Sequence, residues 1–171
     1  MDTKTLNEAE ESRRRITRLV KRIFIEFRTL MDEKLHPYGA TTAQVRLLLA
    51  IRSAPGSSGA QLARQCEVTP QSAQALIQKA EDSGWITRGK DTVNERIVTA
   101  SLTPAGEKLL KIAERSIRKL EAKAWKDVSP RTLGNLIKLF EQCLQNLGPK
   151  ERKHYSLYPT DHSPLLRRRR R

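Results

Sequence analysis

The sequence predicts a mainly helical chain with one small β hairpin, organised as a winged helix-turn-helix flanked by long helices at both ends. Three observations predict this fold. Apolar residues recur at helical spacing near both ends of the chain, a helix, a turn and a second helix occupy its centre, and two short strands follow them. The 171 residues, of which 37% are apolar, are enough for a hydrophobic core.

The N-terminal region, residues 1–40, is expected to hold one amphipathic helix. Over residues 16–31 the apolar side chains are spaced by three and four, and the opposite side is rich in arginine. The sequence HPYG at residues 36–39 supplies the proline and glycine that end a helix. A nearly all-apolar second helix follows, with Thr41 and Gln44 at the spacing of a capping box.

Capping residues mark the helix boundaries in the rest of the chain. A serine or threonine caps a helix N-terminus, a proline fits the first helical position, and a glycine commonly follows the last. Such signals occur at Ser58 with Gln61, Thr69-Pro70, Ser83-Gly84, Thr103-Pro104 and Ser129-Pro130. They divide the chain into a winged helix-turn-helix over residues 41–103, two further helices over residues 104–148, and a basic tail over residues 149–171.

Two strands are expected directly after the helix-turn-helix. Residues 85–88 and 96–102 are rich in β-branched and aromatic side chains, and the polar residues between them form the tip of a hairpin, which is a wing in this position. The terminal helices carry apolar stripes that a small winged helix cannot cover. We therefore expect these helices to pack together and against those of a second copy.

Basic residues dominate the charge of the chain. Lysine and arginine number 33 against 19 aspartates and glutamates, so the formal net charge is +14. Such an excess indicates polyanionic partners, nucleic acid first and anionic membranes second. The terminal run Arg167–Arg171 could add salt-sensitive affinity for DNA, but a disordered tail is the interpretation we favour.

The segment from Leu62 to Leu110 resembles the MarR family of bacterial transcription regulators (multiple antibiotic resistance regulators). It combines the helix-turn-helix with the motif GWITR, an acidic wing that contains arginine, and the motif LTPAGEKLL, and the resemblance extends over about residues 12–147. It implies an obligate homodimer with intertwined N- and C-terminal helices. It also implies recognition helices in successive major grooves of a pseudo-palindromic operator, wings in the flanking minor grooves, and release by a small ligand.

The helix from Thr69 to Ser83 is expected to read double-stranded DNA. Glutamine can pair bidentately with adenine, and alanine can contact the methyl group of thymine. The residues expected to face DNA are Pro70, Gln71, Ser72, Gln74, Ala75, Gln78 and Lys79. The residues expected to pack inward are Ala73, Leu76, Ile77 and Ala80. The alternative is a merely solvated helix face.

The wing is expected to add Arg88, Lys90, Asn94 and Arg96, because a narrow minor groove attracts arginine. The sequence departs from the family pattern here, since Asn94 stands where a second aspartate is usual and Glu95 where an arginine is common. Asn94 can still hydrogen-bond Arg96, but phosphate would repel Glu95. Sequence preference should therefore rest more on the recognition helix. For Arg88, a surface charge at the strand end is an equal alternative to a phosphate contact.

An effector site for a small aromatic or anionic molecule is expected between the terminal helices and the winged helix. Its candidate residues are Phe24, Phe27, Met31, His36, Tyr38 and Arg46. We favour a core role for each, because an aromatic side chain at helical spacing more often packs than binds. Arg46 interrupts an apolar helix, and its burial would require an acid or an anionic ligand. A structural ion pair is the interpretation we favour.

The sequence carries no pattern that indicates an enzyme, a metal site or a cofactor. The three histidines are scattered, and the phosphate loop and nucleophile elbow of common enzyme classes are missing. Cys66 and Cys143 lack CxxC spacing and read as core residues, and the start of the first helix lacks the cysteine of the family's oxidation sensors. No secretory segment or membrane-length apolar run is seen, which predicts a soluble, cytoplasmic protein with no membrane partner.

These features together predict a homodimeric repressor that is sequence-specific for DNA and responsive to a ligand. The alternative is a winged-helix architectural or protein-interaction module with neither a specific operator nor a ligand. The exposed glutamines favour base readout, while the high charge alone fits either function.

Overall fold

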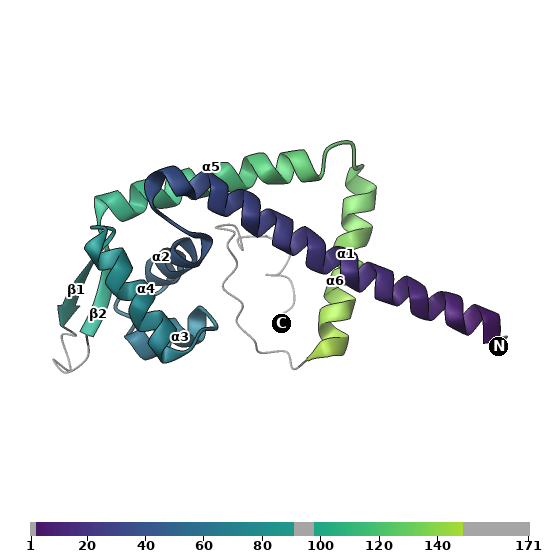
Figure 1. Cartoon of the computed structure of the whole chain (residues 1–171), viewed down its shortest axis with the longest axis horizontal. Helices are drawn as coiled ribbons and strands as arrows, with labels where there is room; N and C mark the ends of the chain where they lie inside the picture. Colours follow the sequence, from purple (N-terminus) through teal and green to yellow (C-terminus); the bar gives the residue numbers. More distant parts are fainter. Residues whose placement is uncertain (1–2, 91–97, 149–171) are drawn as a thin grey trace, which may run out of the picture. The chain divides into compact units, whose positions relative to one another are not determined.

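The computed structural model describes residues 3–90 and 98–148, with side chains described for residues 7–89 and 99–148. Its described residues form six α-helices and one two-stranded antiparallel sheet, which confirms the mainly helical winged fold. The elements are α1 (Thr3–Leu35), a 3-10 turn (His36–Tyr38), α2 (Thr42–Ser53), α3 (Gly59–Gln65), α4 (Pro70–Asp82), β1 (Ile86–Lys90), β2 (Val98–Leu102), α5 (Pro104–Ala124) and α6 (Pro130–Leu147) (Figure 1). The chain divides into two compact units between Thr42 and Ala43.

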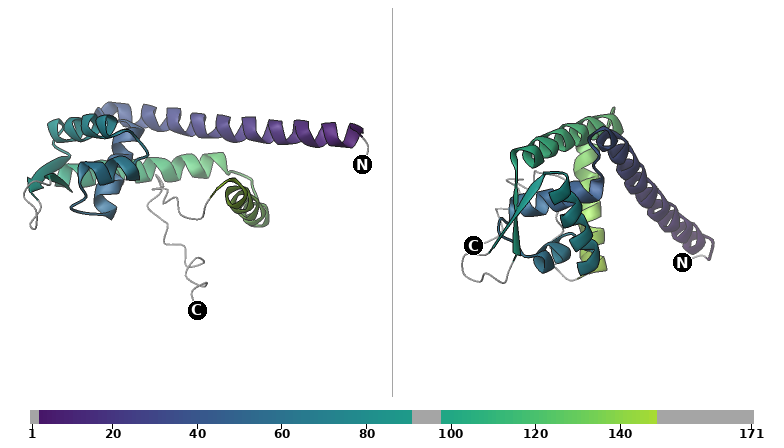
Figure 2. Two further views of the ribbon diagram at one scale, coloured as in Figure 1. Left: turned by 90° about the horizontal axis from the view of Figure 1, so that it is seen from below. Right: turned by 60° about the vertical axis from the view of Figure 1, so that its left-hand side comes forward.

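The first unit consists of α1 and the turn after it. Figure 2 shows α1 as one continuous helix, and it begins well before the apolar stripe that predicted it. The part of α1 before the stripe carries ion pairs along its surface, with Arg14 2.6 Å from Glu10 and Arg18 2.7 Å from Glu11. The helix ends where the sequence predicted, and Gly39 adopts a left-handed φ of 65° that suits glycine.

The start of α2 is anchored by a residue of α1. The Asp32 carboxylate accepts hydrogen bonds from the amide of Thr42 at 2.6 Å and from its hydroxyl at 2.5 Å. Because the first amides of a helix have no partner within the helix, this carboxylate satisfies one of them. The sequence had suggested only Thr41 and Gln44 for the start of α2.

The core of the second unit is organised around α2. This helix is apolar on nearly every side, and most of its residues are buried. The fully buried large side chains of the second unit are Val45, Leu47, Leu48, Ile51, Leu62, Cys66, Ile86 and Leu110. They come from α2, α3 and its C-cap residue, β1 and α5, so these elements share one core.

The capping signals in the sequence correctly located four helix starts. Ser58 and Gln61 form the reciprocal capping box at α3, and the hydroxyls of Thr69, Thr103 and Ser129 cap α4, α5 and α6, each followed by a proline.

Helix α6 has no buried residue, although its apolar stripe is strong. Among the described residues, no helix combines the length and apolar character that a membrane crossing requires.

The start of α5 is packed tightly against the residues that lead into the wing. The Thr103 amide donates to the Trp85 carbonyl at 3.0 Å, and the Thr103 hydroxyl donates to the Gly84 carbonyl at 2.6 Å. A Cβ atom at Gly106 would lie 2.2 Å from the Trp85 carbonyl oxygen. Glycine is therefore required in the motif LTPAGEKLL, and this contact fixes where α5 begins relative to β1.

Candidate nucleic-acid interface

Helix α4 separates its buried and exposed residues along its length. Ala73, Ile77 and Ala80 are buried and Leu76 is half-buried, which confirms the packed side that the sequence predicted. The seven residues expected to face DNA are all exposed: Pro70, Gln71, Ser72, Gln74, Ala75, Gln78 and Lys79. This face carries amide, hydroxyl and methyl groups and a single charge, which is the mixture of donors, acceptors and apolar groups that base edges in a major groove present.

The turn between α3 and α4 sets the position of the exposed face. After Cys66, the Val68 amide donates to the Ala63 carbonyl at 3.0 Å and the Glu67 amide donates to the Arg64 carbonyl at 3.2 Å. This bonding pattern is a Schellman motif, and Glu67 adopts the left-handed φ of 52° that the motif requires. The chain therefore turns sharply here and enters α4 at Thr69.

Arg46 reaches this turn from α2. Its guanidinium donates to the backbone carbonyl of Cys66, at the C-terminal end of α3. The sequence had favoured an ion pair with an acid, so the partner was wrong. The physical requirement was the same, because the carbonyls at a helix C-terminus carry partial negative charge and attract a cation.

The distal end of α4 is joined to β1 by four polar side chains. Arg88 lies 2.7 Å from Glu81 and donates to the Gln78 amide oxygen at 2.6 Å. The Gln78 amide nitrogen donates in turn to Asp82 at 2.9 Å. Both ends of the Gln78 amide are thus engaged, and Arg88 is held on α4 with its side chain only 25% exposed.

The sequence analysis did not predict this network, although one of its contacts could have been predicted from spacing. Gln78 and Asp82 are separated by four residues and so lie next to each other on a helix. The contacts of Arg88 could not be read, because they depend on how β1 folds back along α4.

The wing is a regular antiparallel pair up to the limit of the described residues. Its register places Ile86 opposite Leu102 and Lys90 opposite Val98. Of the wing residues expected to reach DNA, Asn94 and Arg96 lie outside the described residues, as does the side chain of Lys90. Only Arg88 can be described, at the base of the wing.

The residues expected to form an effector site differ widely in exposure. Phe24 and Tyr38 are 62% and 50% exposed, His36 is exposed, Phe27 is half-buried, and Met31 is buried at 3%. These five belong to the first unit and Arg46 to the second, so the pocket itself stays a prediction.

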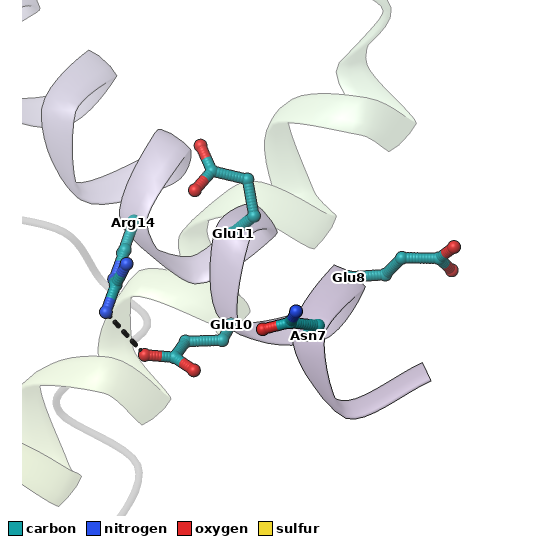
Figure 3. Close-up of a pocket in the computed structure, with 5 residues that line it drawn as sticks. All are labelled: Asn7, Glu8, Glu10, Glu11 and Arg14. Carbon is teal, nitrogen blue, oxygen red and sulfur yellow. Dashed lines mark hydrogen bonds and ion pairs between the residues drawn. The ribbon is translucent and has the colours of Figure 1, made fainter. Parts of the chain in front are cut away.

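A surface hollow elsewhere on α1 is lined by Asn7, Glu8, Glu10, Glu11 and Arg14, and Figure 3 shows all five side chains projecting from successive turns of this one helix. Because a single helix cannot enclose a molecule, this hollow is no substitute for an effector site.

Cys66 has the character of a core residue, as predicted. Its side chain is 2% exposed, and burial raises the pKa of its thiol, an effect that the nearby positive charge of Arg46 offsets only in part. A raised pKa lowers the fraction of reactive thiolate at neutral pH. Cys143, which was expected on a packed stripe, is exposed in the single chain.

Three comparisons bear on this arrangement of α3, α4 and the wing. A model of the MarR family matches residues 38–97. The HTH-type transcriptional repressor Rv2887 of Mycobacterium tuberculosis is 32% identical over 130 residues, which cover 76% of this chain and 91% of the relative. The chain belongs to the MarR family.

Solved structures agree on the fold. The MarR family transcription regulator SP03579 superposes with a TM-score of 0.76 at 16% identity, over 83% of this chain and 94% of that one. A mutant MarR from E. coli, solved in complex with operator DNA, superposes with a TM-score of 0.66 at 22% identity, over 75% and 93%. MarR proteins and the curated relatives are transcription regulators and not enzymes, in agreement with the sequence-based prediction.

Proposed function

We propose that this MarR protein is a transcriptional repressor that binds a specific DNA operator as a homodimer. The exposed face of α4 is the observation that carries the proposal, since its polar groups point outward while Ala73, Ile77 and Ala80 are buried. Two comparisons support it: the relative from M. tuberculosis is named a repressor, and the E. coli MarR was solved with operator DNA. The basic charge of the chain would favour association with DNA in any sequence.

Within the exposed face, we assign base readout to the first half of α4. Gln71 and Gln74 are exposed and lie near the helix N-terminus, which is the end that helix-turn-helix proteins direct at base edges. Gln78 is assigned a different role, because its amide is occupied by Arg88 and Asp82. Gln78 and Arg88 would then hold the wing against α4, and Lys79 would contact phosphate.

The homodimer is inferred from apolar surface that the single chain leaves exposed. On α1, Phe24 is 62% exposed and Ile16 53%, and on α6, Leu144 is 64% and Leu147 83% exposed. Monomeric proteins rarely leave such long apolar stripes in contact with water. Pairing α1 and α6 with those of a second copy would bury these side chains and place two recognition helices on one operator.

The regulation we propose is a shift in population between two spacings of the recognition helices. A small aromatic or anionic effector would favour the spacing that does not fit successive major grooves. Phe24, Phe27, Met31, His36, Tyr38 and Arg46 remain its proposed contacts. A cytoplasmic location follows from the proposal, because a repressor must reach the DNA that carries its operator.

Binding to the chain's own upstream intergenic DNA tests the proposal most directly. At ~0.15 M salt, where non-specific affinity is weakened, that duplex should bind more tightly than a scrambled duplex, with two protein chains per site. The substitution Gln74→Ala should reduce operator affinity by about 5–150-fold, equivalent to the 1–3 kcal/mol of one bidentate base contact, and should leave binding to the scrambled duplex unchanged.

Gln78→Ala is the matched control, since it removes the same amide from the same helix. It should change the preference for operator over scrambled DNA much less than Gln74→Ala does. Equal losses on both duplexes for Gln74→Ala would refute base readout. Equal binding of the unmodified chain to both duplexes would favour the alternative, a winged-helix architectural or protein-interaction module.

A further inference from the structure

Helix α5 has three distinct faces along its length. One face is buried in the core of the second unit and consists of Leu109, Leu110, Ala113, Ile117 and Leu120. The next carries Glu107, Glu114 and Glu121, each seven residues from the one before. The third, which we call the α5 basic face, consists of the exposed side chains Lys108, Lys111, Arg115, Arg118, Lys119 and Lys123. At 3.6 residues per turn these six cations fall within an arc of about 140°.

Arg52 on α2 draws two of the α5 glutamates away from the α5 basic face. It lies 2.6 Å from Glu114 and 3.9 Å from Glu107. Both glutamates stand four residues before a cation, Lys111 and Arg118, and would ordinarily pair with it along the helix. Because their carboxylates turn to Arg52, the neighbouring cations keep their full charge toward solvent.

Helix α1 provides an internal comparison. Its arginines are also exposed, but Arg14, Arg18, Arg22 and Arg28 each lie within 4 Å of a carboxylate on α1 itself. On the α5 basic face, no side chain has such an ion pair within the described part of the chain. Arg118 lies near enough to Glu121 to lower the pKa of that carboxyl, but burial of Glu121 raises the same pKa by more. The α5 basic face therefore presents six cations without an ion pair to any described residue on one side of a single helix, whereas α1 mixes paired and unpaired cations.

We propose that the α5 basic face binds the phosphate backbone of duplex DNA outside the operator contacts of α4. The inference rests on the proposed function, in which the same protomer already holds DNA. Phosphate contacts require cations but no base-reading groups, and this face offers only lysine and arginine. The six cations extend over 16 residues, roughly 22 Å of helix, which equals the rise of about six base pairs.

Two other polyanions fit the face less well. A helix that lies on a membrane inserts an apolar side, but the apolar side of α5 is buried in the core, and none of its large apolar side chains is exposed. A single-stranded nucleic acid is held by aromatic side chains stacked on its bases, and α5 has none. Duplex DNA requires neither feature.

The dependence of DNA binding on salt tests this proposal. The probe is a 40-bp duplex of mixed sequence, titrated with the full chain between 50 and 200 mM salt. The variant Lys111→Gln, Arg115→Gln, Lys119→Gln removes three charges from the α5 basic face. The control variant Arg13→Gln, Arg15→Gln, Lys21→Gln removes three exposed charges from α1, so both have the same net charge.

If the α5 basic face contacts phosphates, its variant loses about 0.9 units of salt slope per contact, or about 2.7 for each protomer that engages the duplex. Raising the salt from 50 to 200 mM would then weaken the unmodified chain and the α1 control about 40-fold more than the α5 variant for each engaged protomer. The preference for upstream over scrambled DNA should be the same in all three proteins.

Equal salt slopes for the α5 and α1 variants would overturn the proposal. It would also be overturned if the α5 variant kept its DNA slope but lost binding to phosphatidylserine vesicles or to a single-stranded oligonucleotide. Failure of the proposed function gives a different result, because the unmodified chain would then show no preference between the upstream and scrambled duplexes whatever its salt slope.

Discussion

Replacement of Gly106 by alanine should destabilise the protein, although alanine is normally the better helix residue. In an exposed helix interior, glycine to alanine stabilises by about 1 kcal/mol. At Gly106 the added Cβ would lie 2.2 Å from the Trp85 carbonyl oxygen, 3.1 Å from its carbonyl carbon and 3.2 Å from a methyl carbon of Leu102. Two of these three atoms belong to the backbone, so no side-chain rotation can relieve the overlap.

The size of the effect follows from the movement that the clash requires. The start of α5 must shift by about 1 Å to restore an ordinary contact, and overpacking of this kind costs about 1–3 kcal/mol. The same shift would strain the 3.0 Å hydrogen bond from the Thr103 amide to Trp85, which is worth roughly 1 kcal/mol. After the helix-propensity gain of about 1 kcal/mol is subtracted, we expect a net loss of about 1–3 kcal/mol, or a fall in Tm of about 2–12 °C.

Thermal and urea unfolding of Gly106→Ala and Gly134→Ala would check this reasoning. Gly134 also lies within a helix, but a Cβ added there meets no atom within 4 Å, so the substitution should raise stability slightly. Light scattering would confirm that both variants keep the same number of chains per particle. If Gly106→Ala were as stable as the unmodified chain, the close approach of α5 to Trp85 would be wrong.

Two further predictions concern buried polar groups. In a Cys143→Ser variant, Cys66 should react with a thiol reagent at pH 8 at least about 100-fold more slowly in the folded chain than in urea. The reason is that its thiol is buried and the pKa of that thiol is raised. Fast labelling of the folded chain would contradict the place of Cys66 in the core. Because the folded pKa exceeds the unfolded one, the stability that Cys66 contributes is complete below the unfolded pKa and is lost as pH rises through the folded value. Asp32→Ala should lower the free energy of unfolding in urea by about 1–2 kcal/mol, because it leaves the Thr42 amide without its acceptor. Asp32→Asn keeps an acceptor oxygen and should recover most of that loss. The same free energy of unfolding for the two variants would show that Asp32 does not cap α2.

Much of the fold was predictable because its signals are local. Thr69-Pro70, Thr103-Pro104 and Ser129-Pro130 each place a cap and a proline within one turn of the helix they open, so no distant contact is needed to read them. The same holds for the alternation of buried and exposed residues along α4, which follows from helical periodicity.

The start of α1 was predicted less well. The apolar stripe marks only its second half, and the first half is a run of charged residues with no apolar period. The ion pairs of Arg14 and Arg18 with glutamates on the same helix accompany this half, and their spacing could have suggested it.

The sequence by itself determined where α3, α4, α5 and α6 begin, which side of α4 is exposed, and that the protein is basic, because each of these depends on residues close together in the chain or on composition alone. Only the tertiary structure decided the roles of the arginines. Arg88 was equally a surface charge or a phosphate ligand until β1 placed it beside Glu81 and Gln78. Arg46 donates a hydrogen bond to a helix carbonyl and does not pair with an acid. Arg52 forms ion pairs with two α5 glutamates that would otherwise lie next to lysine and arginine of α5 itself. A long charged side chain chooses among partners within several ångströms, and which partners lie within that reach is settled only when distant segments pack together.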